Sequence, residues 1–218
     1  MGVMSERFEL SKETRTARDG LTKLYRLKVK IPFEHPIVGR VERGALGGFV
    51  ESLTLSDGKE RISGEAWVYG EAEIYGNASV GGNADVLDYA SVFGNARIMG
   101  EASVFDCARV YGDAVVTGSS GVFDNAQVYD SARILDNAWI YGNASVYGNA
   151  MVFDNADVYG DSQVFGDSEI YCNVGICGEV KLNISICCRH VFKYDWQVEL
   201  WLVNEKDFTG KLQGHILY

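Results

Sequence analysis

Residues 138–158 read AWIYGNASVYGNAMVFDNADV, a stretch in which an aliphatic residue recurs at every sixth position. Outward from this stretch, the same spacing holds without insertion or deletion from Ile62 to Leu182, through 21 consecutive Val, Ile or Leu residues. A helix would place apolar residues three and four apart. A period of six, with Ala and Val two apart, is instead typical of a short strand followed by a turn.

Each unit follows the consensus Val-Tyr-Gly-Asn-Ala-x. In such a strand Ala and Val point to one side and the other two residues point outward. Gly-Asn or Asp-Asn then turns the chain, because these residues tolerate the left-handed backbone conformation at little cost. One hexapeptide cannot bury its own Val, so the units are predicted to stack into a long array.

A second period, three hexapeptides long, sorts the outward positions into three columns, because residues of one kind recur at every eighteenth position. Three distinguishable columns predict three faces per coil, that is, a triangular prism of about 6.7 coils. The first column is aromatic throughout, with Tyr75, Phe93, Tyr111, Tyr129, Tyr147 and Phe165.

Charge divides the chain into three parts. Residues 1–61 hold 12 basic and 9 acidic side chains, residues 62–182 hold 4 and 17, and residues 183–218 hold 4 of each. We therefore expect an N-terminal leader and cap over 1–61, a repeat domain over 62–182, and a β-rich C-terminal tail over 183–218 that covers a face or mediates oligomerisation. The acidic repeat argues against direct binding of nucleic acid, which needs Lys and Arg to neutralise phosphates.

The repeat resembles the hexapeptide-repeat, left-handed parallel β-helix superfamily, and the left-handedness is implied by that resemblance alone. The segment Gly47-Gly48-Phe49-Val50-Glu51, followed by the Val-Tyr-Gly-Asn-Ala units, is similar to a bacterial and prophage subgroup of that superfamily. Members of the subgroup are often described as transferase-like from their fold. The resemblance thus implies an all-β, phage- or prophage-related protein, and it favours a trimer. We expect a homo-oligomer, either a trimer or a dimer.

Enzymes of the superfamily include acetyl-CoA-dependent acyltransferases, which use a His general base near a subunit boundary, and a zinc carbonic anhydrase with three His ligands. Residues 62–182 contain no His, and their unbroken spacing leaves no room for a loop that encloses a cofactor. We therefore predict no catalytic residue, no metal site and no cofactor. The alternative is an acyltransferase that binds acetyl-CoA at a subunit interface, with His190 or His215 as its base.

Two surfaces remain as candidate binding sites. One is the aromatic column, predicted to pack against the tail or against a second copy of the chain, with ring stacking as a further contribution. The other is one edge of the prism, where acidic side chains recur at the spacing of the coils. The residues of this predicted acidic edge are Glu71, Asp88, Asp106, Asp124, Asp161 and Glu179.

Together these features predict a non-catalytic β-helical scaffold or protein-binding module. Its acidic edge and aromatic faces would meet a protein partner, such as a basic host protein, and it would act as an inhibitor or nucleic-acid mimic directed at host defence machinery. No run of about 18 apolar residues indicates a membrane span. The five Cys are expected to be free thiols, and the predicted location is cytoplasmic.

Overall fold

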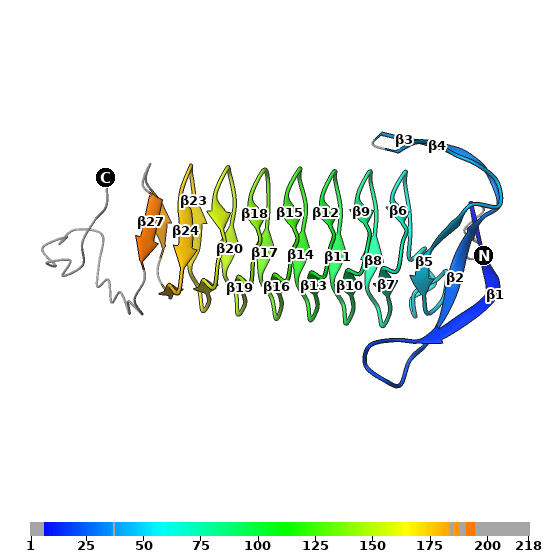
Figure 1. Cartoon of the computed structure of the whole chain (residues 1–218), viewed down its shortest axis with the longest axis horizontal. Coiled ribbons are helices and arrows are strands. Elements are labelled where there is room, and N and C mark those ends of the chain that lie inside the picture. The colour runs from blue at the N-terminus through cyan, green and yellow to red at the C-terminus, as the bar shows by residue number, and fades with distance from the viewer. Residues whose placement is uncertain (1–6, 37, 184, 188–190, 195–218) are drawn as a thin grey trace, which may run out of the picture.

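The computed structural model describes residues 7–36, 38–183, 185–187 and 191–194. Within this part of the chain all regular structure is β, in 27 strands without a helix. The strands wind into an elongated parallel stack, with the leader at one end (Figure 1). The prediction of an all-β parallel solenoid is confirmed.

Three sheets form the three faces of the stack, and successive strands of a face are three hexapeptides apart, as in the pairing of Val92 with Val110. Face 1 contains β5 (Leu46–Val50), β7 (Glu73–Ile74), β10 (Ser91–Val92), β13 (Arg109–Val110), β16 (Gln127–Val128), β19 (Ser145–Val146), β22 (Gln163–Val164) and β25 (Lys181–Leu182). Face 2 contains β8 (Ser79–Val80), β11 (Arg97–Ile98), β14 (Val115–Val116), β17 (Arg133–Ile134), β20 (Met151–Val152), β23 (Glu169–Tyr171) and β26 (Ile186–Cys187). Face 3 contains β6 (Trp67–Val68), β9 (Asp85–Val86), β12 (Ser103–Val104), β15 (Gly121–Val122), β18 (Trp139–Ile140), β21 (Asp157–Val158), β24 (Gly175–Gly178) and β27 (Val191–Tyr194).

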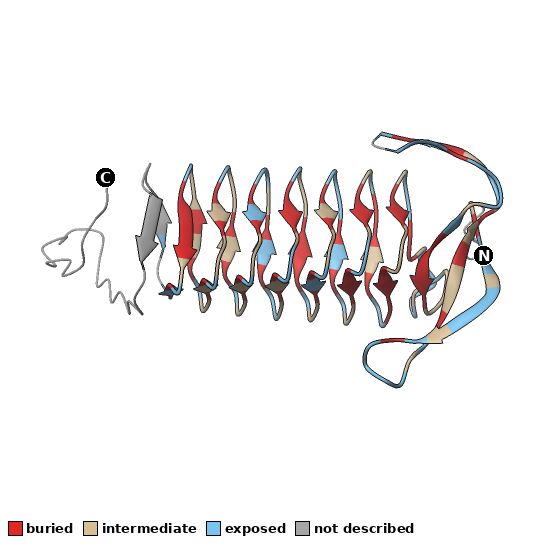
Figure 2. Ribbon diagram, in the orientation of Figure 1, coloured by how far each residue is buried: buried red, intermediate tan, exposed pale blue. Residues whose placement is uncertain are grey.

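The inward residues build one continuous core along the axis of the stack. Val, Ile or Leu and the Ala or Ser four positions later are buried in coil after coil, and Figure 2 shows these positions in red. Between coils, backbone N–H groups donate to carbonyl oxygens of the next coil, for example Tyr111 N to Val128 O at 2.9 Å. Each coil thus supplies the apolar surface and the hydrogen-bonding edge that the next coil needs.

The leader closes the N-terminal end of the stack. Strands β1 (Phe8–Thr16) and β2 (Lys23–Val29) pair antiparallel, β2 pairs antiparallel with β5, and β5 then pairs parallel with β7. Leu27 and Val29 of β2 belong to the solenoid core. A second hairpin, β3 (Phe33–His35) with β4 (Gly39–Val41), extends from the leader along the stack (Figure 1). We call it the arm.

The stack continues beyond both ends of residues 62–182, while the predicted division into three domains stays a prediction. At the first end, Val50 pairs with Ile74, a wider separation than in the regular coils, because a hairpin-like excursion between Ser52 and Arg61 lengthens the coil. At the other end, Ile170 pairs with Ile186, so the separation becomes shorter than in the regular coils. Apart from residues 185–187 and 191–194, the predicted tail after Asn183 lies outside the described residues.

Two residue types provide the positive φ that the turns require. At the first turn position several coils have Gly, such as Gly142 with φ of 71°, and others have Asp, such as Asp124 with φ of 56°. Asp is tolerated there because its carboxylate accepts a backbone N–H: Asp124 Oδ2 lies 2.9 Å from the nitrogen of Gly142 in the next coil. A Cβ on Gly142 in its present conformation would lie 2.9 Å from the backbone nitrogen of Gly160.

We expect Gly142→Asp to change the free energy of unfolding by less than about 1 kcal/mol, since it copies the turn at Asp124. Gly142→Val should cost about 2 kcal/mol or more, because a β-branched residue at positive φ is strained and has no carboxylate to bond to the next coil. Thermal unfolding of both variants measures the difference. Equal midpoints would contradict this account of the turns.

Candidate binding surfaces

Face 1 carries the predicted aromatic column, and its rings form a stacked ladder. Neighbouring ring centroids from Tyr75 to Phe165 are 4.8–5.3 Å apart, with interplanar angles of at most 10°. Each ring buries the faces of its neighbours, so ring stacking is a structural use of this column. Its predicted contact with the tail or with a second copy stays a prediction.

The leader covers the N-terminal end of this ladder. Tyr75 is only 6% exposed and packs with Ala17, Leu24 and Phe49, while Phe93 lies beside this cluster partly buried. Burial raises the pKa of Tyr75 to about 12. Tyr75 thereby links the aromatic column to the leader.

Two shorter ladders occupy the other faces. Phe105, Phe123, Tyr141 and Tyr159 stack along face 3, with centroids 4.8–4.9 Å apart. On face 2, Phe153 stacks on Tyr171 at 4.9 Å. An aromatic residue in the outward column is therefore used in the same way on all three faces.

The acidic edge lies between face 3 and face 1, where the predicted residues all fall at turns. Asp106 Oδ2 accepts the N–H of Asp124 at 3.2 Å, and Asp161 Oδ1 accepts the side-chain amide of Asn143 at 2.8 Å. Asp88 and Glu179 are exposed. Asp106 and Asp161 thus hold their turns as hydrogen-bond acceptors, and all four carboxylates give the edge its negative charge.

Glu71 differs from the rest of the predicted edge because its carboxylate binds the leader. Arg15 lies 2.6 Å and Arg26 lies 2.9 Å from its oxygens, and Arg15 also reaches the buried Glu73 at 3.0 Å. The hydrogen bond from Arg26, the largest cause, holds the pKa of Glu71 below its usual value. The structure thus places Glu71 in the joint between leader and stack, while the other five residues lie further along the edge.

Acidic side chains gather on face 3 and on both edges beside it, and not on the acidic edge alone. Face 3 and the two edges beside it carry 12 of the 17 acidic side chains of residues 62–182. The four basic side chains of that segment lie on the other two faces: Arg109 and Lys181 on face 1, Arg97 and Arg133 on face 2. Consequently, residues 62–182 give one side of the prism most of their acidic side chains and none of their basic ones.

The arm places a buried His beside a buried Asp at the start of face 3. His35 Nε2 lies 3.1 Å from Asp85 Oδ1, and His35 Nδ1 accepts the N–H of Val38 at 3.4 Å. Burial lowers the pKa of His35 and raises the pKa of Asp85 to about 6. Sequence reasoning missed this contact, because His35 and Asp85 lie far apart in the chain and neither belongs to a motif.

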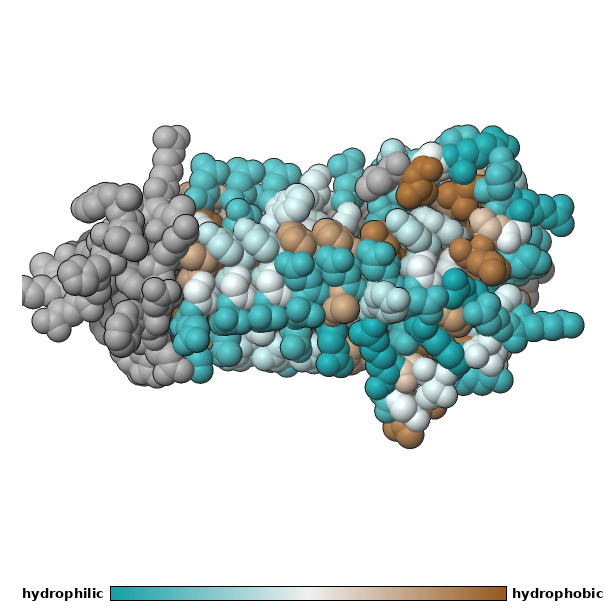
Figure 3. All heavy atoms as spheres, viewed as in Figure 1, coloured by the Kyte–Doolittle hydropathy of each residue, from teal (hydrophilic) through white to brown (hydrophobic). Residues whose placement is uncertain are grey.

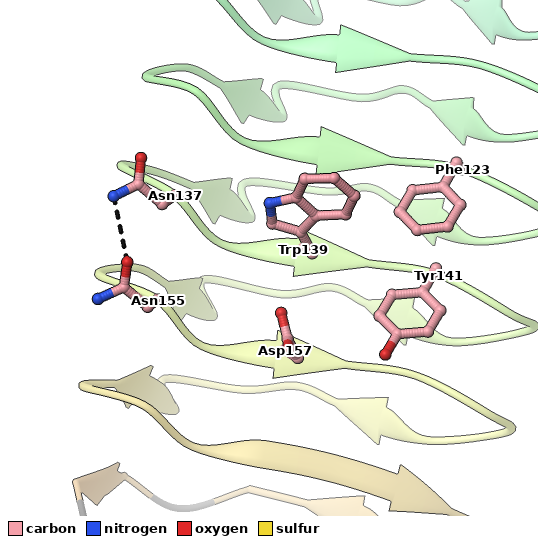
Figure 4. A pocket seen from close by; sticks show the side chains of 6 residues that line it. All are labelled: Phe123, Asn137, Trp139, Tyr141, Asn155 and Asp157. Carbon is pink, nitrogen blue, oxygen red and sulfur yellow. Dashed lines mark hydrogen bonds between the residues drawn. The ribbon is translucent and has the colours of Figure 1, made fainter.

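A shallow hollow of about 540 Å³ opens further along face 3. Its lining residues are Phe123, Asn137, Trp139, Tyr141, Asn155 and Asp157, which Figure 4 shows around the exposed indole of Trp139. The ring of Phe123 meets that indole edge-on, with centroids 5.5 Å apart at 88°. We call the hollow the Trp139 hollow.

Seen from the side of Figure 3, the coils are mainly hydrophilic, with apolar patches near the leader and in short stretches along the stack.

Comparison with known families agrees with this geometry. Residues 108–124, about one coil, match the family model described as the YdcK beta solenoid repeat. The chain is a β-solenoid repeat protein. No curated protein matches it. Because the match spans about one coil, it supports the β-solenoid fold. Membership of the prophage subgroup stays a prediction.

Metal-ligand clusters are absent from the described residues, where no group of three or more His, Cys, Asp or Glu side chains could hold a metal ion. That part of the chain also contains no helix long and apolar enough to cross a membrane. His190 and His215, the bases of the acyltransferase alternative, lie outside the described residues.

Proposed function

We propose that this β-solenoid is a non-catalytic binding protein that docks a basic protein partner on face 3 and the acidic edge. The observation that carries the proposal is the one-sided charge: residues 62–182 place 12 acidic side chains and no basic one on face 3 and its two edges. Of these twelve, Glu65 and Glu71 pair with arginines of the leader. Such a surface attracts cationic partners and speeds their association. The stacked ladders keep the surface rigid, so little conformational freedom is lost on binding.

A nucleic-acid-binding protein is the class of basic partner that the array suits best. With coils about 4.8 Å apart, the ten of these carboxylates that no leader arginine pairs, from Asp85 to Glu179, span roughly five coils and place one charge per roughly 2.5 Å of the long axis. Duplex DNA carries one charge per about 1.7 Å. The solenoid thus offers a rod whose linear charge density is of the same order as that of DNA, which supports a role as a nucleic-acid mimic.

The test compares two triple variants that remove equal charge from different edges. Asp106, Asp124 and Asp161 lie on the acidic edge; Asp113, Asp130 and Asp167 lie on the edge between face 1 and face 2. All six accept turn hydrogen bonds from the neighbouring coil, so Asp→Asn keeps an acceptor at each position.

Wild type and both variants are immobilised and used to capture proteins from nuclease-treated host extract at low salt. We expect wild type and the Asp113/Asp130/Asp167 variant to retain the same basic nucleic-acid-binding protein, and the Asp106/Asp124/Asp161 variant to lose it. Retention by all three forms, or by none, would overturn the proposed function.

A further inference from the structure

Arginine side chains of the leader bind the stack through a recurring combination of contacts. Arg15 lies over the ring of Phe49, with 3.8 Å from its guanidinium carbon to the ring centroid, while it binds the carboxylates of Glu71 and Glu73. Arg26 lies over the same ring at 4.6 Å and binds Glu71. In both cases the arginine stacks on an aromatic ring and pairs with a coil carboxylate.

A third arginine repeats the arrangement at the start of face 3. Arg7 lies 4.6 Å from the centroid of Phe33 and binds Glu65 at 2.9 Å. Three arginines of the leader therefore meet the stack through one combination of ring and carboxylate. The combination joins a cation–π contact to a charge-assisted hydrogen bond.

The Trp139 hollow offers the same two components further along face 3. Trp139 is 44% exposed, and its indole rests over Gly121, where an added Cβ would lie 3.6 Å from indole Cδ2. Asp157 occupies the directly paired position on the next coil. Figure 4 shows the Asp157 carboxylate beside the indole, with the amides of Asn137 and Asn155 along one side.

Electrostatics favours a cationic occupant. Residues 62–182 contribute no Lys or Arg to face 3 and its edges. Burial raises the pKa of Asp157, as expected for a carboxylate that has lost water without gaining a cation. An anion would meet uncompensated repulsion here.

We propose that the Trp139 hollow binds the guanidinium group of an arginine from the basic partner, stacked on the indole and paired with Asp157. This inference rests on the proposed function and names the anchor by which the partner is held. Arginine suits the hollow better than lysine because its planar group can stack on the ring and present two N–H groups to one carboxylate together. The ring of Phe123 fixes the orientation of the indole, so the site is preformed.

The test uses two blocked peptides, hexa-arginine and hexa-lysine, titrated into the full chain by calorimetry at one low ionic strength. We expect wild type to bind hexa-arginine about tenfold more tightly than hexa-lysine, from the stacking and the paired hydrogen bonds. Trp139→Ala and Asp157→Asn should each remove most of that preference. Tyr89→Ala is the matched control, because Tyr89 is a 55% exposed ring that lies on the acidic edge, outside the hollow, and it should keep the preference.

The outcomes separate this inference from the proposed function. If wild type binds both peptides equally and Trp139→Ala changes nothing, the arginine site is overturned while the acidic docking surface stands. If Tyr89→Ala removes the preference as fully as Trp139→Ala, the hollow is not the site. If neither peptide binds wild type, the proposed function fails as well.

Discussion

Replacing Ile134 by aspartate is expected to unfold the central coils of the solenoid. Ile134 in β17 is fully buried at the centre of the stack, with Val116 above it and Val152 below it in the same column. A buried carboxylate without a partner costs more than about 4 kcal/mol, and each coil depends on its neighbours for its packing surface. We expect loss of hydrogen-exchange protection across roughly residues 110–158, together with a lower thermal midpoint.

Ile134→Val is the matched control, since Val already occupies the adjacent positions of the column. It should cost only about 0.5–1.5 kcal/mol and leave exchange protection in place. Protection of the central coils in the Ile134→Asp variant, equal to that of wild type, would show that the stack does not share one core.

Replacing Arg61 by alanine is expected to destabilise the entrance to the stack by about 3 kcal/mol. Arg61 is 2% exposed, and its guanidinium donates to three backbone carbonyls, those of Ser52, Gly76 and Ala78, at 2.8–3.2 Å. Removing it leaves these carbonyls without their donor and opens a cavity beneath the 52–61 excursion. Chemical denaturation and limited proteolysis within residues 52–61 measure the two consequences.

Arg61→Lys separates geometry from charge at the same position. Lysine keeps the positive charge but has no planar fork, so it should recover less than half of the lost stability. Wild-type stability in Arg61→Lys, together with a change below about 0.5 kcal/mol in Arg61→Ala, would contradict the role given to these hydrogen bonds.

The coils were predictable from the sequence because one local rule repeats. The sixth-residue period places Ile134 and its column in the core, and the longer period of three hexapeptides gives the three faces. At the two ends of the stack the coil length departs from the regular period. The first coil is lengthened by the excursion that Arg61 holds, and the pairing of Ile170 with Ile186 shortens the last one. No local sequence pattern predicts either change in coil length.

The surface was predictable only in part, for a related reason. The spacing located the acidic edge and the aromatic columns, since both repeat at the period of the coils. It did not reveal that Glu71 is bound by Arg15 and Arg26, from which it is separated by 56 and 45 residues. Nor did it reveal the Trp139 hollow, which depends on Gly121 leaving space for the indole.

The central claim, that a cationic partner binds the acidic edge and face 3, is tested most directly by labelling carboxylates with a carbodiimide and an amine. The full chain is labelled with and without blocked hexa-arginine, and the rate at each carboxylate is measured by mass spectrometry. We predict slower labelling of Asp106, Asp124 and Asp161 when the peptide is bound, and unchanged labelling of Asp113, Asp130 and Asp167. Equal slowing on both edges, or slowing confined to Asp113, Asp130 and Asp167, would contradict it.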